Sequence, residues 1–123
     1  MGRLALGRQA EERAFRYLCR RGMRPVARNF RSAGGEIDLV MLDGDCLAFV
    51  EVRTRGERSF VAARLTVDRR KQRKLVHAAM MFLARNALFR HHPCRFDVIG
   101  VDRDAEGRIR MDWVRDAFRA DDS

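Results

Sequence analysis

The apolar positions along the chain change their spacing several times, and each change marks a new element. Helical spacing ends before Gly22, a residue typical of the position just after a helix. Alternating apolar and polar positions follow, separated by turn-like stretches rich in Gly and Asp. The pattern predicts a helix at 7–21, an extended stretch at 23–30, a hairpin at 34–55, a long helix at 67–88, and strands at 95–102 and 108–114.

The expected order of elements is therefore α-β-β-β-α-β-β. Helices that lie between sheet segments indicate a mixed α/β fold, in which the helices pack on a central sheet. The 123 residues, 46% of them apolar, suffice for one compact domain with a real core and are too few for two. We expect one domain with its core at about 7–102 and a C-terminal strand and short tail at 103–123. Residues 54–65 are expected to form a polar, mobile loop.

The predicted hairpin places acids inside runs that are otherwise apolar, namely Glu36, Asp38 and Glu51 in GGEIDLVMLDGDCLAFVEVRTR. Side chains alternate faces along a strand. One face should carry Glu36, Asp38, Val40, Leu42, Leu47, Phe49, Glu51 and Arg53, and the other Ile37, Leu39, Met41, Val50 and Val52. A turn centred on positions 44–45 would pair 38 with 51, and a turn centred on 43–44 would pair 36 with 51. Either register puts all three acids on one face.

Two interpretations of these acids are open at this point. The charged face of the hairpin could simply lie in water. Alternatively, the apolar side chains near the turn on the same face must be covered, which leaves the carboxylates at the edge of a cleft. Two carboxylates about 5 Å apart, at an effective dielectric of about 20, repel by roughly 3 kcal/mol, so they would separate, take up a proton or bind a cation. A hard divalent ion with oxygen ligands, Mg²⁺ or Mn²⁺, would relieve the repulsion.

Each predicted helix adds polar residues that point toward the hairpin. At 100° per residue, Glu11 falls inside the apolar arc of the first helix, so we expect it to face the sheet; a helix-end carboxylate stabilised by the helix dipole is the alternative. On the second helix, Lys71 and Gln72 continue core-facing stripes, although Lys71 could instead extend along the sheet edge to water. The helical residues expected to face solvent or phosphate are Arg69, Arg70 and Arg73.

The charge balance narrows the class of partner. The formal net charge is +9, from 26 basic and 17 acidic residues, which favours an anionic partner, most commonly nucleic acid. All basic residues except Lys71 and Lys74 are arginine, which indicates codon bias but does not explain the excess of basic over acidic residues. No cluster of aromatic residues suggests base stacking, so duplex or branched DNA is a better candidate than a single strand.

Several classes of protein are disfavoured. The sequence has neither a run of about 18 apolar residues nor an N-terminal signal segment, so we expect no membrane span and a cytoplasmic location. The three cysteines, Cys19, Cys46 and Cys94, are expected to be reduced thiols packed as small hydrophobes. Adjacent His91 and His92 lack the spacing of helical zinc ligands, so a zinc site is not indicated.

Several motifs together carry a family resemblance. Asp38, a gap of twelve residues and then Glu51-Val52-Arg53 resemble the PD-(D/E)xK signature of restriction-endonuclease-like nucleases. The wider set of strings, in chain order, is GRQAEERAFRYLCRRG, ARNFR, GGEIDLV, FVEVRTR, VDRRKQRKL and RFDVIGV. Over 7–102 the chain thus resembles the YraN-like family of small uncharacterised bacterial proteins, related in fold to archaeal Holliday-junction resolvases. The resemblance implies a restriction-endonuclease-like mixed sheet flanked by helices.

The resemblance also implies roles for individual residues. Asp38, Glu51 and Glu11 correspond to metal-binding acids, and Glu36 and Gln72 would support them. Arg53 stands where the signature has a lysine; because arginine is effectively always protonated, it can stabilise charge but cannot activate water. Lys71 would supply a second cation. The residues expected to contact nucleic-acid phosphates are Arg55, Arg69, Arg70 and Arg73.

The implied activity is Mg²⁺- or Mn²⁺-dependent hydrolysis of DNA phosphodiester bonds in duplex or branched substrates. One alternative is a catalytically inactive nucleic-acid-binding module that keeps the fold. The other is a basic adaptor that binds acidic proteins. A homodimer is compatible with the sequence, which does not decide the oligomeric state.

Overall fold

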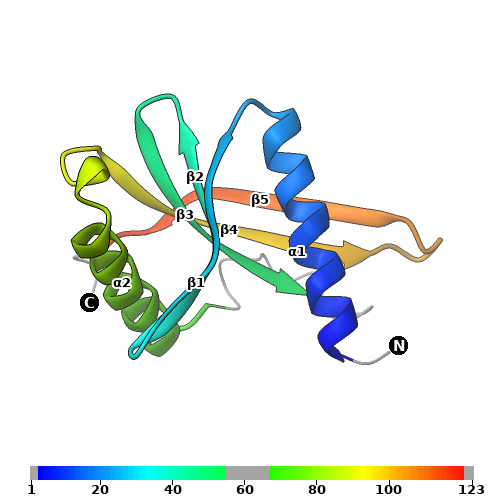
Figure 1. The fold of residues 1–123 in the computed structure, drawn as a ribbon. Coiled ribbons are helices and arrows are strands. Elements are labelled where there is room, and N and C mark those ends of the chain that lie inside the picture. The colour runs from blue at the N-terminus through cyan, green and yellow to red at the C-terminus, as the bar shows by residue number, and fades with distance from the viewer. Residues whose placement is uncertain (1–2, 55–66, 121–123) are drawn as a thin grey trace.

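The computed structural model describes residues 3–54 and 67–120, with side chains described from residue 8 onward (Figure 1). Its elements are α1 (Arg3–Arg20), β1 (Arg24–Ser32), β2 (Gly35–Asp43), β3 (Cys46–Thr54), α2 (Arg69–Arg85), the 3-10 helix η2 (Ala87–Phe89), β4 (Cys94–Arg103) and β5 (Ile109–Phe118). The predicted order α-β-β-β-α-β-β is confirmed.

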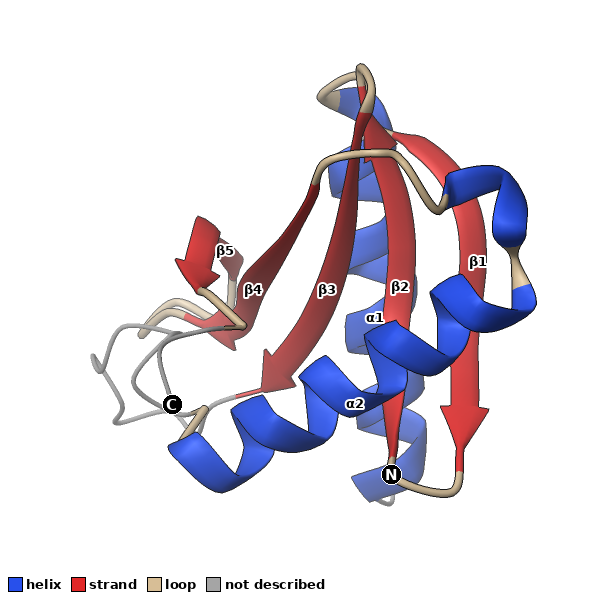
Figure 2. Ribbon diagram, turned by 90° about the vertical axis from the view of Figure 1, so that its left-hand side faces the viewer, coloured by secondary structure: helices blue, strands red, loops and turns tan. Residues whose placement is uncertain are grey.

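The five strands form one mixed sheet in the order β1-β2-β3-β4-β5. Neighbouring strands are antiparallel except β3 and β4, which are parallel. Parallel neighbours require a crossover connection, and α2 lies within that connection. The two helices pack on opposite faces of the sheet (Figures 1 and 2). This architecture is the restriction-endonuclease-like mixed α/β fold that the sequence predicted.

Each face of the sheet has its own hydrophobic core. The core beneath α2 includes Val40, Leu47, Phe49, Leu75, Ala78, Phe82, Phe96 and Val98. The core beneath α1 includes Ala10, Ala14, Leu18, Leu39, Met41, Ala48, Val50 and Ile99. Because β3 contributes to both cores, it is covered on both sides, which explains its nearly continuous apolar sequence.

Glycines with positive φ fix two of the predicted boundaries. Gly22, which follows α1, has φ +93°, and its N–H donates to the Cys19 carbonyl at 3.0 Å. Gly44 has φ +61° and is the first residue of the two-residue turn between Asp43 and Cys46. Few residues other than glycine adopt such φ values. The hairpin therefore has the register that is centred on positions 44–45.

Several boundaries and one burial prediction were wrong. The second helix begins at Arg69 rather than 67, because the Asp68 carboxylate caps it by accepting from the Lys71 N–H at 2.8 Å. It ends at Arg85, before η2. The strand predicted at 108–114 continues to Phe118, which pairs with Phe96 of β4. Cys94 is exposed at the start of β4 rather than packed as a small hydrophobe.

Residues 55–66, which include most of the predicted mobile loop, lie outside the described residues. No helix in the described part of the chain is both long enough and apolar enough to cross a membrane.

A candidate carboxylate site where two strands diverge

The pairing between β2 and β3 ends close to the predicted acids. Regular pairs run from Asp43–Cys46 at the turn to Leu39–Val50. One residue further, the Val52 N–H donates to Oδ2 of Asp38 at 2.8 Å instead of to a backbone carbonyl of β2. The two strands separate from this point on (Figure 2). Asp38 therefore satisfies a backbone donor that the diverging strands leave without a ladder partner.

The strict alternation predicted for β2 is wrong at Asp38. Ile37 packs in the core beneath α2, whereas Leu39 packs in the core beneath α1 and Val40 again beneath α2. The cause lies in the neighbouring strand, where Asn29 has φ +53° between the pairs Arg28–Leu39 and Phe30–Ile37. A left-handed residue rotates the strand, so the faces exchange at this level.

This exchange of faces places Asp38 at the boundary between the two sides of the sheet. Its charge raises the pKa of Glu11, which belongs to α1 on one side. The charge of Lys71, which belongs to α2 on the other side, opposes the rise in the pKa of Asp38. Glu11 and Lys71 thus approach the same carboxylate from opposite helices.

Buried Glu51 on β3 forms a pair with half-buried Asp38. Glu51 is 5% exposed, and the charge of Asp38 acts on its carboxyl. Two cations flank Glu51: Nζ of Lys71 lies 3.8 Å from Oε2, and a terminal guanidinium nitrogen of Arg53 lies 3.8 Å from Oε1. We call Asp38, Glu51, Arg53 and Lys71 the carboxylate site.

Burial makes both carboxyls of the pair reluctant to ionise. Removal from water, followed by the nearby charge of Asp38, raises the pKa of Glu51 from 4.5 to about 8, against the opposing influence of Lys71 and Arg53. Burial likewise raises the pKa of Asp38, although the Val52 N–H stabilises its ionised form. With this raised pKa, the Glu51 carboxyl holds a proton at neutral pH in the absence of a bound cation.

Glu11 and Glu36 border this pair. Burial raises the pKa of Glu11, and the charges of Asp38 and Glu36 raise it further. With its amide nitrogen turned toward Glu11, Asn29 donates to both carboxylate oxygens, at 3.2 and 3.3 Å. Glu36 forms an ion pair with Arg31, at 3.6 Å. The left-handed Asn29 thus both shapes the strand and holds Glu11, a role that sequence reasoning missed.

The turn before β2 lies directly against α2, which brings the first residues of β2 near Lys71. A Cβ atom on Gly35 would come within 2.7 Å of the Lys74 carbonyl oxygen, and one on Gly34 would overlap the ring of His77. Only glycine fits at such a close backbone approach. The GG of the GGEID string is therefore explained by packing against the helix.

The remaining predicted residues have other surroundings. Nε2 of Gln72 donates to the Val67 carbonyl at 3.0 Å, so this side chain stabilises the start of α2. Arg69, Arg70 and Arg73 are exposed on the first turns of α2. Arg55 lies outside the described residues.

The chemistry of the pair fits a hard divalent cation. Buried carboxylate oxygens are the ligands that Mg²⁺ and Mn²⁺ prefer, and Mg²⁺ is usually held by one or two carboxylates, with water and substrate phosphates as its other ligands. Among the described residues, no three His, Cys, Asp or Glu side chains form a group with metal-ligand spacing. The three acids predicted as ligands, Asp38, Glu51 and Glu11, therefore do not form such a group.

The raised pKa of Glu51 predicts an unusual dependence of stability on pH. Between pH 4.5 and about 8, folded Glu51 keeps a proton that the unfolded chain has released, so the free energy of unfolding falls as the pH rises. The glutamine side chain in Glu51→Gln does not ionise, so the variant lacks this contribution to the pH dependence. We expect its stability relative to wild type to increase by about 3 kcal/mol from pH 5 to pH 8.5, measured by urea unfolding without divalent ions. A stability difference that is constant across this range would contradict a raised pKa.

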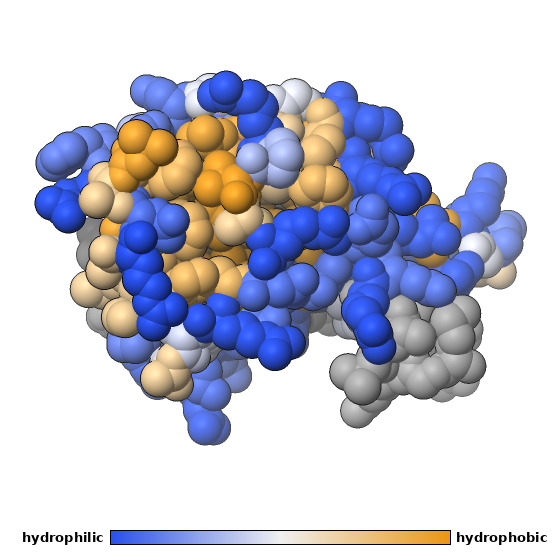
Figure 3. Space-filling model, in the orientation of Figure 1, coloured by the Kyte–Doolittle hydropathy of each residue, from blue (hydrophilic) through white to orange (hydrophobic). Residues whose placement is uncertain are grey.

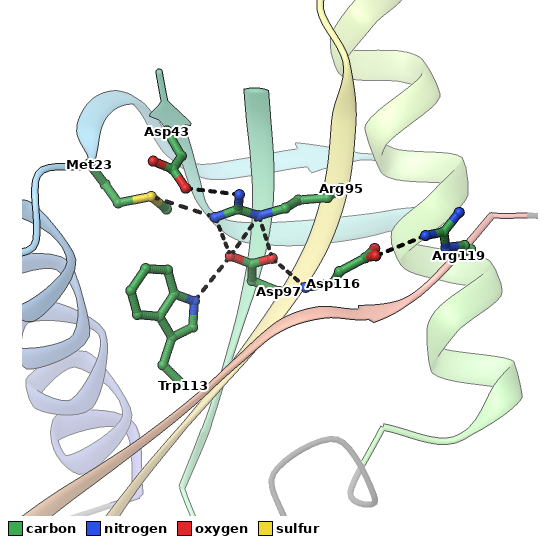
Figure 4. Close-up of polar contacts among 7 residues, drawn as sticks. All are labelled: Met23, Asp43, Arg95, Asp97, Trp113, Asp116 and Arg119. Carbon is green, nitrogen blue, oxygen red and sulfur yellow. Dashed lines mark hydrogen bonds and ion pairs between the residues drawn. The ribbon is translucent and has the colours of Figure 1, made fainter. Parts of the chain in front are cut away.

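A second buried acid, Asp97 of β4, was missed by sequence reasoning. Asp97 is 0% exposed and accepts from the Arg95 guanidinium at 2.9 and 3.1 Å, from Nε1 of Trp113 at 3.0 Å and from the Asp116 N–H at 3.0 Å. Arg95 also contacts Asp43 and Met23, which connects β4 to β2 and to the end of α1 (Figure 4). In the sequence, the only sign of this buried acid is that Asp97 stands within the mostly apolar string RFDVIGV.

The fold and the diverging strands with paired acids define a restriction-endonuclease-like domain. The model of uncharacterised protein family UPF0102 matches residues 10–101, and the chain belongs to this family, which is related to the restriction-endonuclease-like nuclease superfamily. A UPF0102 protein of Alcanivorax borkumensis is 46% identical over 91% of this chain and 90% of its own length. One of Ectopseudomonas mendocina is 47% identical over 94% and 95%.

Proposed function

We propose that the protein is a metal-dependent nuclease that hydrolyses phosphodiester bonds of duplex or branched DNA. The observation that carries this proposal is the pair of half-buried Asp38 and buried Glu51, flanked by Lys71 and Arg53 at the point where two strands diverge. A carboxyl pair that holds a proton in the absence of a cation costs stability. The placement of this pair beside Lys71 and Arg53 favours a chemical role over a structural one.

In this proposal, Asp38 and Glu51 hold Mg²⁺ or Mn²⁺, which supplies the positive charge that polarises a phosphate oxygen and acidifies water. Arg53 and Lys71 lie on both sides of Glu51 and would stabilise the negative charge that develops on the phosphate. Glu11, held by Asn29, would contribute a further negative charge that favours a cation near Asp38. Exposed arginines would bind the DNA backbone without reading its sequence.

The second candidate function is a nucleic-acid-binding module without turnover. The observation that favours it is Arg53 at the lysine position of the signature, because a guanidinium cannot release a proton to assist the attack of water. Lys71 Nζ, at the same 3.8 Å from Glu51, is the group that could compensate.

A cleavage assay with Arg53→Lys tests the proposal. Labelled linear, flapped and four-way DNA are incubated with and without Mn²⁺, and products are resolved on denaturing gels. We expect weak cleavage by wild type that requires Mn²⁺, and a rise of about tenfold or less in Arg53→Lys, since lysine can both carry charge and orient water. Arg110→Lys on β5 is the matched control and should behave as wild type. If neither wild type nor Arg53→Lys cleaves any substrate although both bind it, the nuclease proposal is wrong and the binding module stands.

A further inference from the structure

A groove lies between α1 and β5, away from the carboxylate site. Its volume is about 500 Å³, and its lining residues are Arg13, Arg16, Tyr17, Arg20, Arg21, Ile109 and Met111. At 100° per residue, Tyr17 and Glu11 lie on opposite flanks of the buried arc of α1. The groove is therefore on the flank of α1 that does not face Asp38.

The groove concentrates positive charge, and its lining residues include no acid. Of its four arginines, Arg16 is paired with Glu12 at 3.1 Å. Within the part of the chain that the structure describes, no carboxylate forms an ion pair with Arg13, Arg20 or Arg21. Like charges held together in a concave surface create a strong positive potential, which an anionic ligand would relieve.

Aromatic rings hold one of these arginines in place. The guanidinium of Arg21 lies 4.2 Å from the ring centre of Tyr17, which meets the Trp113 ring edge to face at 6.4 Å. The guanidinium of Arg115 lies 4.1 Å from the ring centre of Trp113. A guanidinium held over an aromatic ring can still donate from its N–H groups, and this planar set of donors matches a phosphate group.

The spacing of the arginines suits a repeating anion. Arg13 and Arg20 are two turns apart on α1, about 10 Å along the helix axis, which equals the axial rise of about three base pairs of a DNA duplex. Ile109 and Met111 of β5 form an apolar wall opposite them. A wall of low polarity strengthens the field of the adjacent charges. The surface over α1 is mostly hydrophilic, whereas hydrophobic residues gather over β1 and beside α2 (Figure 3).

We propose that the groove between α1 and β5 binds the sugar-phosphate backbone of duplex DNA, as a contact separate from the carboxylate site. The inference rests on the proposed function, which identifies the ligand as DNA. It deepens that function because it assigns much of the affinity for DNA to a surface that takes no part in hydrolysis. The residues that carry the contact are Arg13, Arg20 and Arg21, with Tyr17 as the support for Arg21.

The test is a salt titration with Arg13→Ala/Arg20→Ala. Binding of a fluorescent 20-base-pair duplex is measured by anisotropy in EDTA, over a range of KCl concentrations. Each lost phosphate contact reduces the slope of log K against log salt by about 0.9, so the double variant should lose about two units of slope and about tenfold in affinity at low salt. The matched control, Arg85→Ala/Arg90→Ala on the α2 side, removes the same charge and should keep the wild-type slope.

The outcomes separate the two proposals. Equal losses in both double variants, or none in the groove variant, would overturn the groove while leaving the nuclease proposal intact. Cleavage that fails in every assay, together with the expected loss in the groove variant, would end the nuclease proposal and keep the groove. If the groove variant loses affinity for polyglutamate more than for duplex DNA, the groove inference is wrong and an acidic protein is the partner.

Discussion

Replacement of Asp97 by alanine is expected to lower the free energy of unfolding by about 3–5 kcal/mol, because the change removes one member of a buried ion pair. The Arg95 side chain is 16% exposed and would keep a single acidic partner, Asp43. The indole N–H of Trp113 and the backbone N–H of Asp116, which are part-buried, would also lose their acceptor, and this loss adds to the cost. Urea unfolding followed by far-ultraviolet circular dichroism measures the effect independently of Trp113 fluorescence, which the substitution itself would alter.

Two further variants show whether the loss comes from the network. Asp102→Ala, on the same strand, removes a carboxylate that accepts from the adjacent Arg103 N–H, and should cost less than about 1 kcal/mol. Asp97→Asn keeps the shape of the side chain but not its charge. Its loss in the free energy of unfolding should lie between those of Asp97→Ala and Asp102→Ala. A loss of under 1 kcal/mol in Asp97→Ala would mean that the surrounding donors find other partners, and that this network does not attach β5 to the sheet.

Much of the fold could be predicted because its signals are local. Helical periodicity, the glycine at position 22 and the turn around Gly44 depend on neighbouring residues, and each specified the observed element. The extent of β5 depends on a contact between distant residues. Asp97 accepts from the Asp116 N–H, nineteen positions away in the chain, and Asp116 adopts φ +50°, so the sequence between 114 and 118 does not look like a regular strand.

In the candidate site, too, features set by neighbouring residues were predictable and those set by distant contacts were not. The acids and their strands were visible in the sequence because charge inside an apolar run is costly. Their relative orientation was not, because period-two alternation predicts the same face for Ile37 and Leu39, whereas Ile37 packs beneath α2 and Leu39 beneath α1. The left-handed conformation of Asn29 on the neighbouring strand cancels that rule. Asparagine is one of the few residues that adopt such φ values readily, so its presence in a predicted strand was the signal to weigh.

Loss of cleavage in Glu51→Gln is the prediction that separates catalysis from binding. Glutamine keeps the size of the side chain but provides no negative charge, so if Asp38 and Glu51 hold the ion, Mg²⁺- or Mn²⁺-dependent cleavage should fall by at least about 10³-fold. The variant should also lose the rise in melting temperature that Mn²⁺ is expected to give wild type at pH 8, because an ion that binds the folded state stabilises it.

DNA binding by Glu51→Gln should stay within about twofold of wild type, since in the proposed function exposed arginines rather than the buried acid would contact phosphate. Glu106→Gln, in the exposed turn before β5, is the matched control, because it makes the same chemical change where no catalysis is proposed. Retained cleavage in Glu51→Gln would exclude Glu51 as a ligand. A parallel loss of DNA binding and cleavage would instead mean that the buried pair organises the diverging strands rather than holding an ion, and the stability of Glu51→Gln at pH 8 would then show how much of the fold depends on it.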